Sequence, residues 1–226
     1  VCRVADTYEV GFLEGIETRR VDLDGRTVVP GFVDAWTRLA ADGGRPSGNE
    51  GADAGAPGGV DRAREIVTDA LEDARERGLT AVHDEVTSPV VARAYHELAR
   101  EGALPISVRL TYGVDNEATQ GPTPIDAVET LGLTPGTGTG RLHVEAIGVD
   151  VGDRQPEAVR AVLRRAQEAE FTVSVTAADG DALSTLLSGL EGLDAPWLRV
   201  RLGVAPTESQ IRALGAADAT VVGRPG

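Results

Sequence analysis

The chain has 226 residues, of which 41% are hydrophobic and 4% aromatic, and it carries a formal net charge of −14 at pH 7. This length is sufficient for one sizeable domain with a packed core. The excess of carboxylates argues against nucleic acid or an anionic membrane surface as a partner, because both would be repelled. No apolar run approaches the ~20 residues that span a bilayer, so we expect no membrane segment.

All 22 basic residues are arginines, and this abundance of Asp and Glu without lysine resembles the proteins of salt-loving archaea. There, salt screens the self-repulsion of an acidic, hydrated surface. Codon bias in a GC-rich genome is an alternative explanation. The single cysteine, Cys2, excludes an internal disulfide and predicts a reducing, cytoplasmic setting. Because the chain contains no methionine, even at position 1, we expect a fragment or a processed product.

The first 29 residues predict short strands and turns, with an acidic turn over residues 21–26 between two apolar runs. Residues 28–36 predict the first strand of a larger sheet. Residues 41–59 are rich in glycine, alanine and aspartate and have no apolar face to bury, so we expect a mobile loop there.

Helices and strands then alternate regularly. Asp61 is the expected N-cap of a helix that Gly78 stops, and Thr207 that of a later one. Further helices are predicted from residue 89 and over 159–169 and 181–190, with strands over 79–83, 106–112, 142–149, 171–175, 198–204 and 219–222. This alternation predicts an α/β fold with a parallel sheet. Seven units fit an incomplete (β/α)8 barrel, a TIM barrel that in full takes ~250 residues, although an open doubly wound sheet remains an alternative.

Residues 28–39, VVPGFVDAWTRL, resemble the first barrel strand of the amidohydrolase superfamily. In that family a Pro-Gly-Phe-x-Asp-x-His-x-His run delivers two metal-binding imidazoles. The two histidine positions here hold Trp36 and Arg38, and neither an indole nor a guanidinium is a metal ligand. Asp34 is retained, and we expect it to bond the nearby backbone or Arg38.

Later segments resemble the same family in order along the chain. Residues 78–84, GLTAVHD, resemble its second strand, residues 173–183 its fifth, 198–204 its sixth and 211–225 its seventh. The histidine position of the fifth strand holds Thr176. The carbamylated lysine that bridges two metals in many members falls at about Gly148, and the chain contains no lysine. The eighth-strand aspartate has no counterpart.

The resemblance implies a shortened, degenerate member of the subgroup that hydrolyses N-acyl or N-substituted compounds at non-peptide C–N bonds. It implies a β-sandwich remnant over residues 1–29 and a barrel over 30–226. The family uses zinc or another divalent metal, but the expected ligands are missing, so we expect no metal cofactor in this chain.

Other residues are candidates for chemistry. His83, Asp84 and Glu85 lie where a barrel strand meets its loop, and a histidine followed by two acids could bind a divalent ion or supply a general base. Neighbours on a strand point to opposite faces, which is the competing interpretation. His143 and Glu145 alternate on one strand, so both could face the barrel interior, or both could face outward. His96, in the middle of a predicted helix, is expected at the surface.

Two further patterns have ordinary interpretations. Asp150, Asp153, Asp179 and Asp181 follow two predicted strands and could form an oxygen-rich cation site, although solvated carboxylates are expected in so acidic a chain. Residues 136–140, GTGTG, precede a strand, whereas phosphate-binding loops follow one, so we expect a flexible connection.

Three hypotheses follow. In the first, the chain is an amidohydrolase-like pseudoenzyme in which Trp36 and Arg38, with Asp34 and Thr176, bind an anionic or planar small molecule. Such a protein could also form homo-oligomers or pair with an active paralogue, and Trp36 and Arg38 could instead only fill the emptied metal cavity. In the second, it is an active C–N hydrolase rebuilt around the His83, Asp84, His143 and Glu145 candidates. In the third, it is a truncated product without independent function.

Overall fold

The computed structural model describes residue 11 and residues 15–39, 59–113, 124–152 and 154–222. The chain separates into two compact units, Val1–Pro30 and Gly31–Gly226. Apart from Gly59, the loop predicted over residues 41–59 lies outside the described residues, as does Asp153.

The described residues of the first unit form turns and no strand. The acidic turn predicted over residues 21–26 is present: the amide of Arg26 donates to the carbonyl of Leu23 at 3.0 Å, and Gly25 has a φ of 76°. The short strands expected around it are not formed within these residues. Val28 is accordingly 70% exposed, since an isolated extended segment has no sheet face to bury it.

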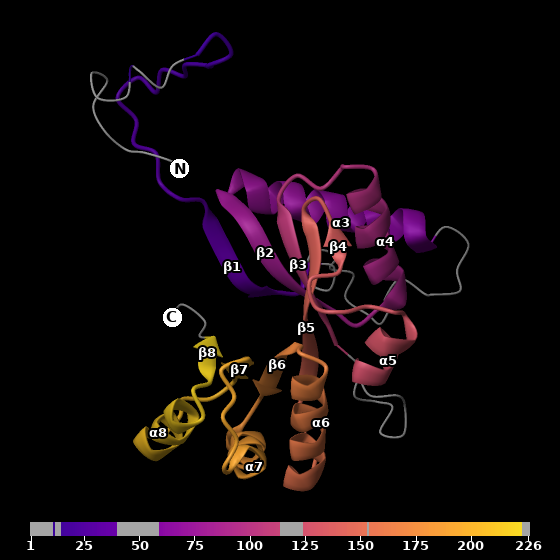
Figure 1. Ribbon diagram of the computed structural model, residues 1–226, viewed down its shortest axis with the longest axis vertical. Helices are drawn as coiled ribbons and strands as arrows, with labels where there is room; N and C mark the ends of the chain where they lie inside the picture. The colour runs from indigo at the N-terminus through magenta and orange to yellow at the C-terminus, as the bar shows by residue number, and fades with distance from the viewer. Residues whose placement is uncertain (1–10, 12–14, 40–58, 114–123, 153, 223–226) are drawn as a thin grey trace. The chain divides into compact units, whose positions relative to one another are not determined.

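The second unit is built on parallel strands that follow one another in chain order, β1-β2-β3-β5-β6-β7-β8, with the short β4 antiparallel to β5 (Figure 1). The strands are β1 (Phe32–Thr37), β2 (Leu79–Val86), β3 (Ser107–Tyr112), β4 (Gly138–Thr139), β5 (Leu142–Asp150), β6 (Thr172–Ala177), β7 (Leu198–Leu202) and β8 (Thr220–Val222). A doubly wound sheet would reverse its strand order at a switch point. The seven described parallel strands keep one direction and form a nearly closed barrel, which confirms the predicted incomplete TIM barrel.

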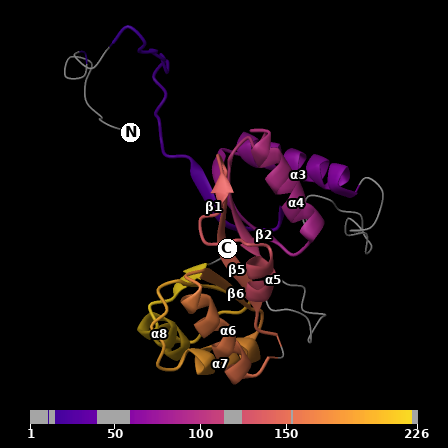
Figure 2. The ribbon, with the colours of Figure 1, turned by 45° about the vertical axis from the view of Figure 1, so that its right-hand side comes forward.

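The helices alternate with these strands and cover the outside of the sheet. They are α3 (Gly59–Glu76), α4 (Pro89–Arg100), α5 (Pro124–Thr130), α6 (Pro156–Glu168), α7 (Gly180–Leu190) and α8 (Glu208–Ala216). Figure 2 shows α3 and α4 beside the first strands and α6, α7 and α8 beside the last ones. No helix among the described residues is long and apolar enough to cross a membrane.

Several boundaries differ from the predictions. The helix expected from Asp61 begins at Gly59, so Asp61 lies in its first turn and is not its cap. The segment expected as a flexible connection over 136–140 contains β4, which pairs with the start of β5. The short helix α5 was not predicted at all, because its seven residues carry too little periodicity to show an amphipathic face.

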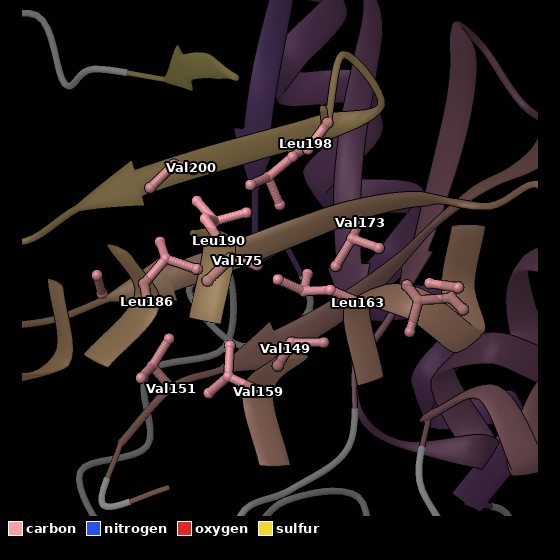
Figure 3. Packing of buried hydrophobic residues seen from close by; sticks show 14 of the residues in the cluster. Val149, Val151, Val159, Leu163, Val173, Val175, Leu186, Leu190, Leu198 and Val200 are labelled. Atoms are coloured by element: carbon pink, nitrogen blue, oxygen red, sulfur yellow. The ribbon is translucent and has the colours of Figure 1, made fainter. Parts of the chain in front are cut away.

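The core lies between the strands and the helices. One cluster packs α3 and α4 on β2 and β3, and includes Val82 and Leu110. The larger cluster packs α6, α7 and α8 on β5, β6 and β7, where Val149, Val175 and Val200 meet the helices (Figure 3). Because side chains alternate along each strand, the residues between these apolar positions face the barrel interior, and there most of them are polar.

Candidate functional site

The carboxylate of Glu85 on β2 is the centre of a group of polar side chains inside the barrel. Its Oε2 accepts a hydrogen bond from the indole Nε1 of Trp36 at 2.8 Å, and its Oε1 accepts one from Nη2 of Arg38 at 2.7 Å. The Glu85 side chain is 9% exposed, whereas that of Arg38 is 39% exposed. Both residues that replace the family's histidines therefore bind one internal carboxylate.

A second guanidinium covers the indole. The guanidinium carbon of Arg201, on β7, lies 3.5 Å from the centroid of the Trp36 ring, and that of Arg38 lies 5.7 Å away. Both are within the range of a cation–π interaction. β1 and β7 are not neighbours in the sheet, so this contact crosses the barrel interior. Thr176 is the register partner of Arg201 on β6, and it occupies the same interior face.

Two glycines leave room for the Glu85 carboxylate. A Cβ added to Gly113 would lie 3.1 Å from Oε1 of Glu85, and one added to Gly148 would lie 3.4 Å from the same atom. Gly148 is about where the resembled family carries its bridging lysine. In this chain the Glu85 carboxylate, which Trp36 and Arg38 bind, lies against the Gly148 backbone.

A second polar group lies one step earlier along the strands. Arg199 of β7 donates from Nη1 to Nδ1 of His83 at 3.0 Å and also hydrogen bonds Glu145 of β5. Arg109 of β3 approaches Glu145 with an Nε–Oε2 distance of 3.7 Å, and Nδ1 of His83 lies 3.8 Å from the same Oε2. The structure therefore brings together the sequence candidates His83 and Glu145, with two arginines that sequence reasoning missed.

The hydrogen bond from Arg199 fixes the state of His83. A guanidinium only donates, so Nδ1 of His83 accepts and the ring carries its proton on Nε2. Burial lowers the pKa of His83, and Arg199 and Arg109 lower it further, while Glu145 and Asp34 raise it. Burial is the largest of these effects, so His83 is neutral at pH 7 and its 3.8 Å approach to Glu145 is not an ion pair.

Asp84 points away from this interior. Its side chain is fully buried on the helix side of β2, where it accepts from the hydroxyls of Thr37 and Tyr95 and from the amide of Leu39. Burial raises the pKa of Asp84, although these three donors oppose the shift. His83 and Asp84 therefore do not converge on one site, because alternation along β2 separates them.

The remaining candidates have local partners. His143 lies on the same face as Glu145, but its Nδ1 is 3.5 Å from the carbonyl of Gly136 near β4. Asp34 accepts from the backbone amide of Trp36 at 3.1 Å, as expected for a bond to the nearby backbone. The prediction that His96 lies at the surface is wrong: the residue is half-buried, and its Nε2 lies 2.9 Å from the hydroxyl of Tyr112.

Two of the four aspartates expected as possible cation ligands, Asp150 and Asp179, accept hydrogen bonds from backbone amides. Asp179 is the N-cap of α7 and accepts from the amides of Asp181 and Ala182, while Asp150 accepts from that of Gly152. In the described part of the chain, no three His, Cys, Asp or Glu side chains are grouped so that they could hold a metal ion. Guanidiniums and an indole surround Glu85, and two guanidiniums and the His83 imidazole surround Glu145, so the described interior side chains offer too few ligands to fit a divalent metal.

Arg109, Arg199 and Arg201 are the interior residues that sequence reasoning missed as candidates, and Glu85 was named only as the second acid after His83. The signal was present in the period-2 pattern of β7, LRVRL, whose arginines alternate with core residues. A charged residue between two core positions of a barrel strand faces the interior, so a search for such positions would have found them.

No protein-family profile and no curated protein match the chain. Solved structures do. An uncharacterized metal-dependent hydrolase from Pyrococcus horikoshii aligns with 72% of this chain and 36% of its own, at 19% identity and a TM-score of 0.60. A variant of atrazine chlorohydrolase from Arthrobacter aurescens, complexed with zinc and atraton, aligns with 85% of this chain and 52% of its own, at 15% identity and a TM-score of 0.58.

Guanine deaminase from C. acetobutylicum, with bound guanine, aligns with 87% of this chain and 54% of its own, at 14% identity and a TM-score of 0.59. The chain thus spans between about a third and about a half of the length of these enzymes. The first of these is described as a metal-dependent hydrolase, and the second holds zinc. The fold of this chain is therefore the one that it shares with these enzymes, the incomplete α/β barrel that the sequence predicted.

Proposed function

We propose that this chain is an amidohydrolase-like barrel that does not carry out metal-dependent hydrolysis and that binds a small, planar anion at Trp36 and Arg38. The observation that carries the proposal is the double use of Glu85, whose two carboxylate oxygens accept from Trp36 and Arg38. A carboxylate already bound in this way is the kind of group that a carboxylate ligand would replace.

The charges of the interior support an anion. Arg38, Arg109, Arg199 and Arg201 lie in or beside the two polar groups, against Asp34, Glu85 and Glu145. With His83 neutral, these two groups set four guanidiniums against three carboxylates, and Asp150, the register partner of Thr176, adds a further carboxylate at the end of β5, in a chain whose net charge is −14. Fixed cations inside an acidic protein favour a negatively charged ligand.

The ligand's shape follows from the two groups at the site. Arg38 offers a planar fork of donors, 39% exposed, that matches a carboxylate. Trp36 offers an aromatic ring on which a guanidinium already stacks. A planar carboxylate would pair with Arg38 and lie against the Trp36–Arg201 stack, and an aliphatic cation would do neither.

Fluorescence tests this proposal directly. The chain has two tryptophans, so a Trp197→Phe background leaves Trp36 as the only reporter. The Nε1 of Trp197 is buried and has no hydrogen-bond partner among the described residues, so this change removes no described bond. Benzoate is the probe, and benzylamine is the control of the same ring with the opposite charge.

We expect benzoate to change the Trp36 emission saturably and benzylamine to leave it unchanged. Arg38→Gln, which keeps a polar side chain of similar length, should weaken the benzoate response at least tenfold, since a bidentate charged pair is lost. An equal response to both probes, or an unchanged response in R38Q, would refute anion binding at this site.

The second candidate is an active hydrolase of non-peptide C–N bonds centred on His83 and Glu145. The neutral state of His83 favours it, since a base must be unprotonated to accept a proton. Against it, Arg199 donates to both residues, so neither is presented alone. Hydrolysis of N-acyl amino acids that disappears in His83→Gln would establish this candidate in place of the first.

The composition indicates the same cellular environment for both candidate functions. A lysine-free chain with a net charge of −14 and a single cysteine suits a reducing cytoplasm with a high salt concentration. We expect the chain to stay folded and to bind benzoate in molar potassium chloride. At low ionic strength we expect it to lose both.

A further inference from the structure

The buried carboxylate of Asp84 holds the last part of β1 from the helix side of the sheet. Its Oδ1 accepts from the Thr37 hydroxyl at 2.7 Å and from the Leu39 amide at 2.8 Å, and its Oδ2 accepts from the Tyr95 hydroxyl at 2.7 Å. All three donors belong to the described residues, and Asp84 itself is fully buried. Burying a carboxylate costs free energy unless hydrogen bonds compensate for the lost water, and two of the three bonds of Asp84 come from the segment 37–39.

That segment carries the residues of the proposed site. Thr37 and Leu39 flank Arg38 in the chain, and both are held by the same Oδ1 of Asp84. The Thr37 side chain and the Leu39 backbone amide are thus fixed on either side of Arg38, whose side chain extends to the interior. There its guanidinium meets Glu85, the residue that follows Asp84 on β2.

The strand is irregular at this point. Asp34 pairs with Val82 and Thr37 pairs with Asp84, so two residues of β1, Ala35 and Trp36, lie opposite the single residue His83. This is the count of a β-bulge, which leaves a residue outside the regular ladder and turns a side chain in a new direction. Asp34 accepts the amide of Trp36 inside the bulge at 3.1 Å.

The bulge is therefore held at both ends by carboxylates. Asp34 bonds the Trp36 amide within the bulge, and Asp84 bonds Thr37 and Leu39 just after it. Without the second of these, the ladder alone would not fix where the bulge lies, since strands without a strong side-chain pattern slip in register. A slip by one residue would turn Trp36 and Arg38 to the helix side.

We infer that Asp84 is a positioning residue: by binding Thr37 and Leu39 it fixes the bulged end of β1 and so places the Trp36 indole and the Arg38 guanidinium on Glu85. The inference deepens the proposed function, because it names what builds that binding site. It does not depend on any ligand, since the contacts that it explains are internal.

The test measures acrylamide quenching of Trp36 in the Trp197→Phe background and of Trp197 in the Trp36→Phe background. Asp84→Ala removes the acceptor for Thr37 and Leu39, so we expect a severalfold rise in the quenching constant of Trp36. Trp197 lies in the segment before β7, away from Asp84 in the sheet order, so its quenching should not change.

Tyr95→Phe is the matched control. It removes one donor to Asp84 but leaves Thr37 and Leu39 bound, so it should lower the thermal midpoint without exposing Trp36. Asp84→Asn keeps an oxygen that accepts from Leu39, and it should restore most of the Trp36 protection lost in D84A. If D84A does not fold, Thr37→Val tests the positioning role instead, because valine has nearly the shape of threonine but cannot donate to Asp84. We expect T37V to raise Trp36 quenching by less than D84A would.

Unchanged Trp36 quenching in a folded D84A or in T37V would overturn the inference. A parallel rise for Trp36 and Trp197 would also overturn it, because Asp84 would then contribute only general stability. If benzoate fails to bind while D84A exposes Trp36 alone, the proposed function is refuted and the positioning role stands. If benzoate binds and D84A leaves Trp36 protected, the proposed function stands and the positioning role of Asp84 is refuted.

Discussion

The indole Nε1 of Trp36 donates to Oε2 of Glu85 at 2.8 Å, and the two residues stand 49 positions apart on adjacent strands. In the family that this barrel resembles, the position of Trp36 belongs to a metal-binding histidine. Here the bond turns the same position into part of a polar cluster that Arg38 and Arg201 complete.

Removal of the Glu85 carboxylate should destabilise the chain. Glu85→Ala leaves Trp36 and Arg38 without their shared acceptor in a site where Glu85 is only 9% exposed. We expect a loss of about 2 kcal/mol in the free energy of unfolding, measured by urea denaturation in molar salt. Glu129→Ala, which breaks the half-exposed pair with Arg165, should cost less than about 1 kcal/mol. Equal effects would show that the Glu85 cluster is an ordinary surface contact.

The state of His83 predicts how stability depends on pH. Burial lowers its pKa in the folded chain, so the unfolded chain takes up the proton first as the pH falls. Its contribution is therefore present above the unfolded pKa of about 6.5 and is lost as the pH falls toward the lower, folded value. His83→Gln, which keeps an acceptor for Arg199, should reduce the stability lost between about pH 7 and pH 5.

His96 acts in the same direction, because burial lowers its pKa as well. The double variant H83Q/H96Q should therefore show a flatter pH dependence than either single variant. Urea midpoints collected across this pH range measure both effects. A wild-type slope that persists in the double variant would show that other groups dominate the acid sensitivity.

Asp179 distinguishes a helix cap from a cation ligand. Its carboxylate accepts from the amides of Asp181 and Ala182 at the start of α7, so Asp179→Ala should cost about 1 kcal/mol of stability. Asp179→Asn should recover most of that loss, since an amide oxygen also caps. A stabilisation by calcium that only the wild type shows would instead support a cation site.

Salt should stabilise the folded chain. With 36 acidic and 22 basic residues, self-repulsion opposes the compact state until ions screen it. The urea midpoint should therefore rise steadily from about 0.1 M to molar potassium chloride, where the Debye length is only about 3 Å. A midpoint independent of salt would leave codon bias as the explanation of the composition.

The fold was predictable from the sequence because its signals are local. The capping residue Thr207, the apolar faces of the helices and the runs such as 142–149 each mark an element, and their alternation implies parallel strands. The chain order of the strands, which separates a barrel from a doubly wound sheet, came only from the structure. Pairing between distant strands leaves no trace in the spacing of one sequence.

The candidate site was predictable only in part. Trp36 and Arg38 stood out because a familiar motif has other residues there. Glu85 stood out only as the second acid after His83, since its role depends on the bulge in β1, and the spacing of the sequence does not show where a bulge lies. Arg201 reaches Trp36 from β7, a contact that exists only because the sheet curves.

We infer that the cluster of Trp36, Glu85 and Arg38 lies where the resembled family has a metal site, and metal content tests this most directly. Elemental analysis is made on protein purified in molar salt without chelator, and again after incubation with zinc and gel filtration. We predict far less than one metal ion per chain in both samples, in protein that unfolds cooperatively. About one zinc, iron or manganese ion per chain, lost in His83→Gln or Glu145→Gln, would contradict the account and establish a rebuilt metal site.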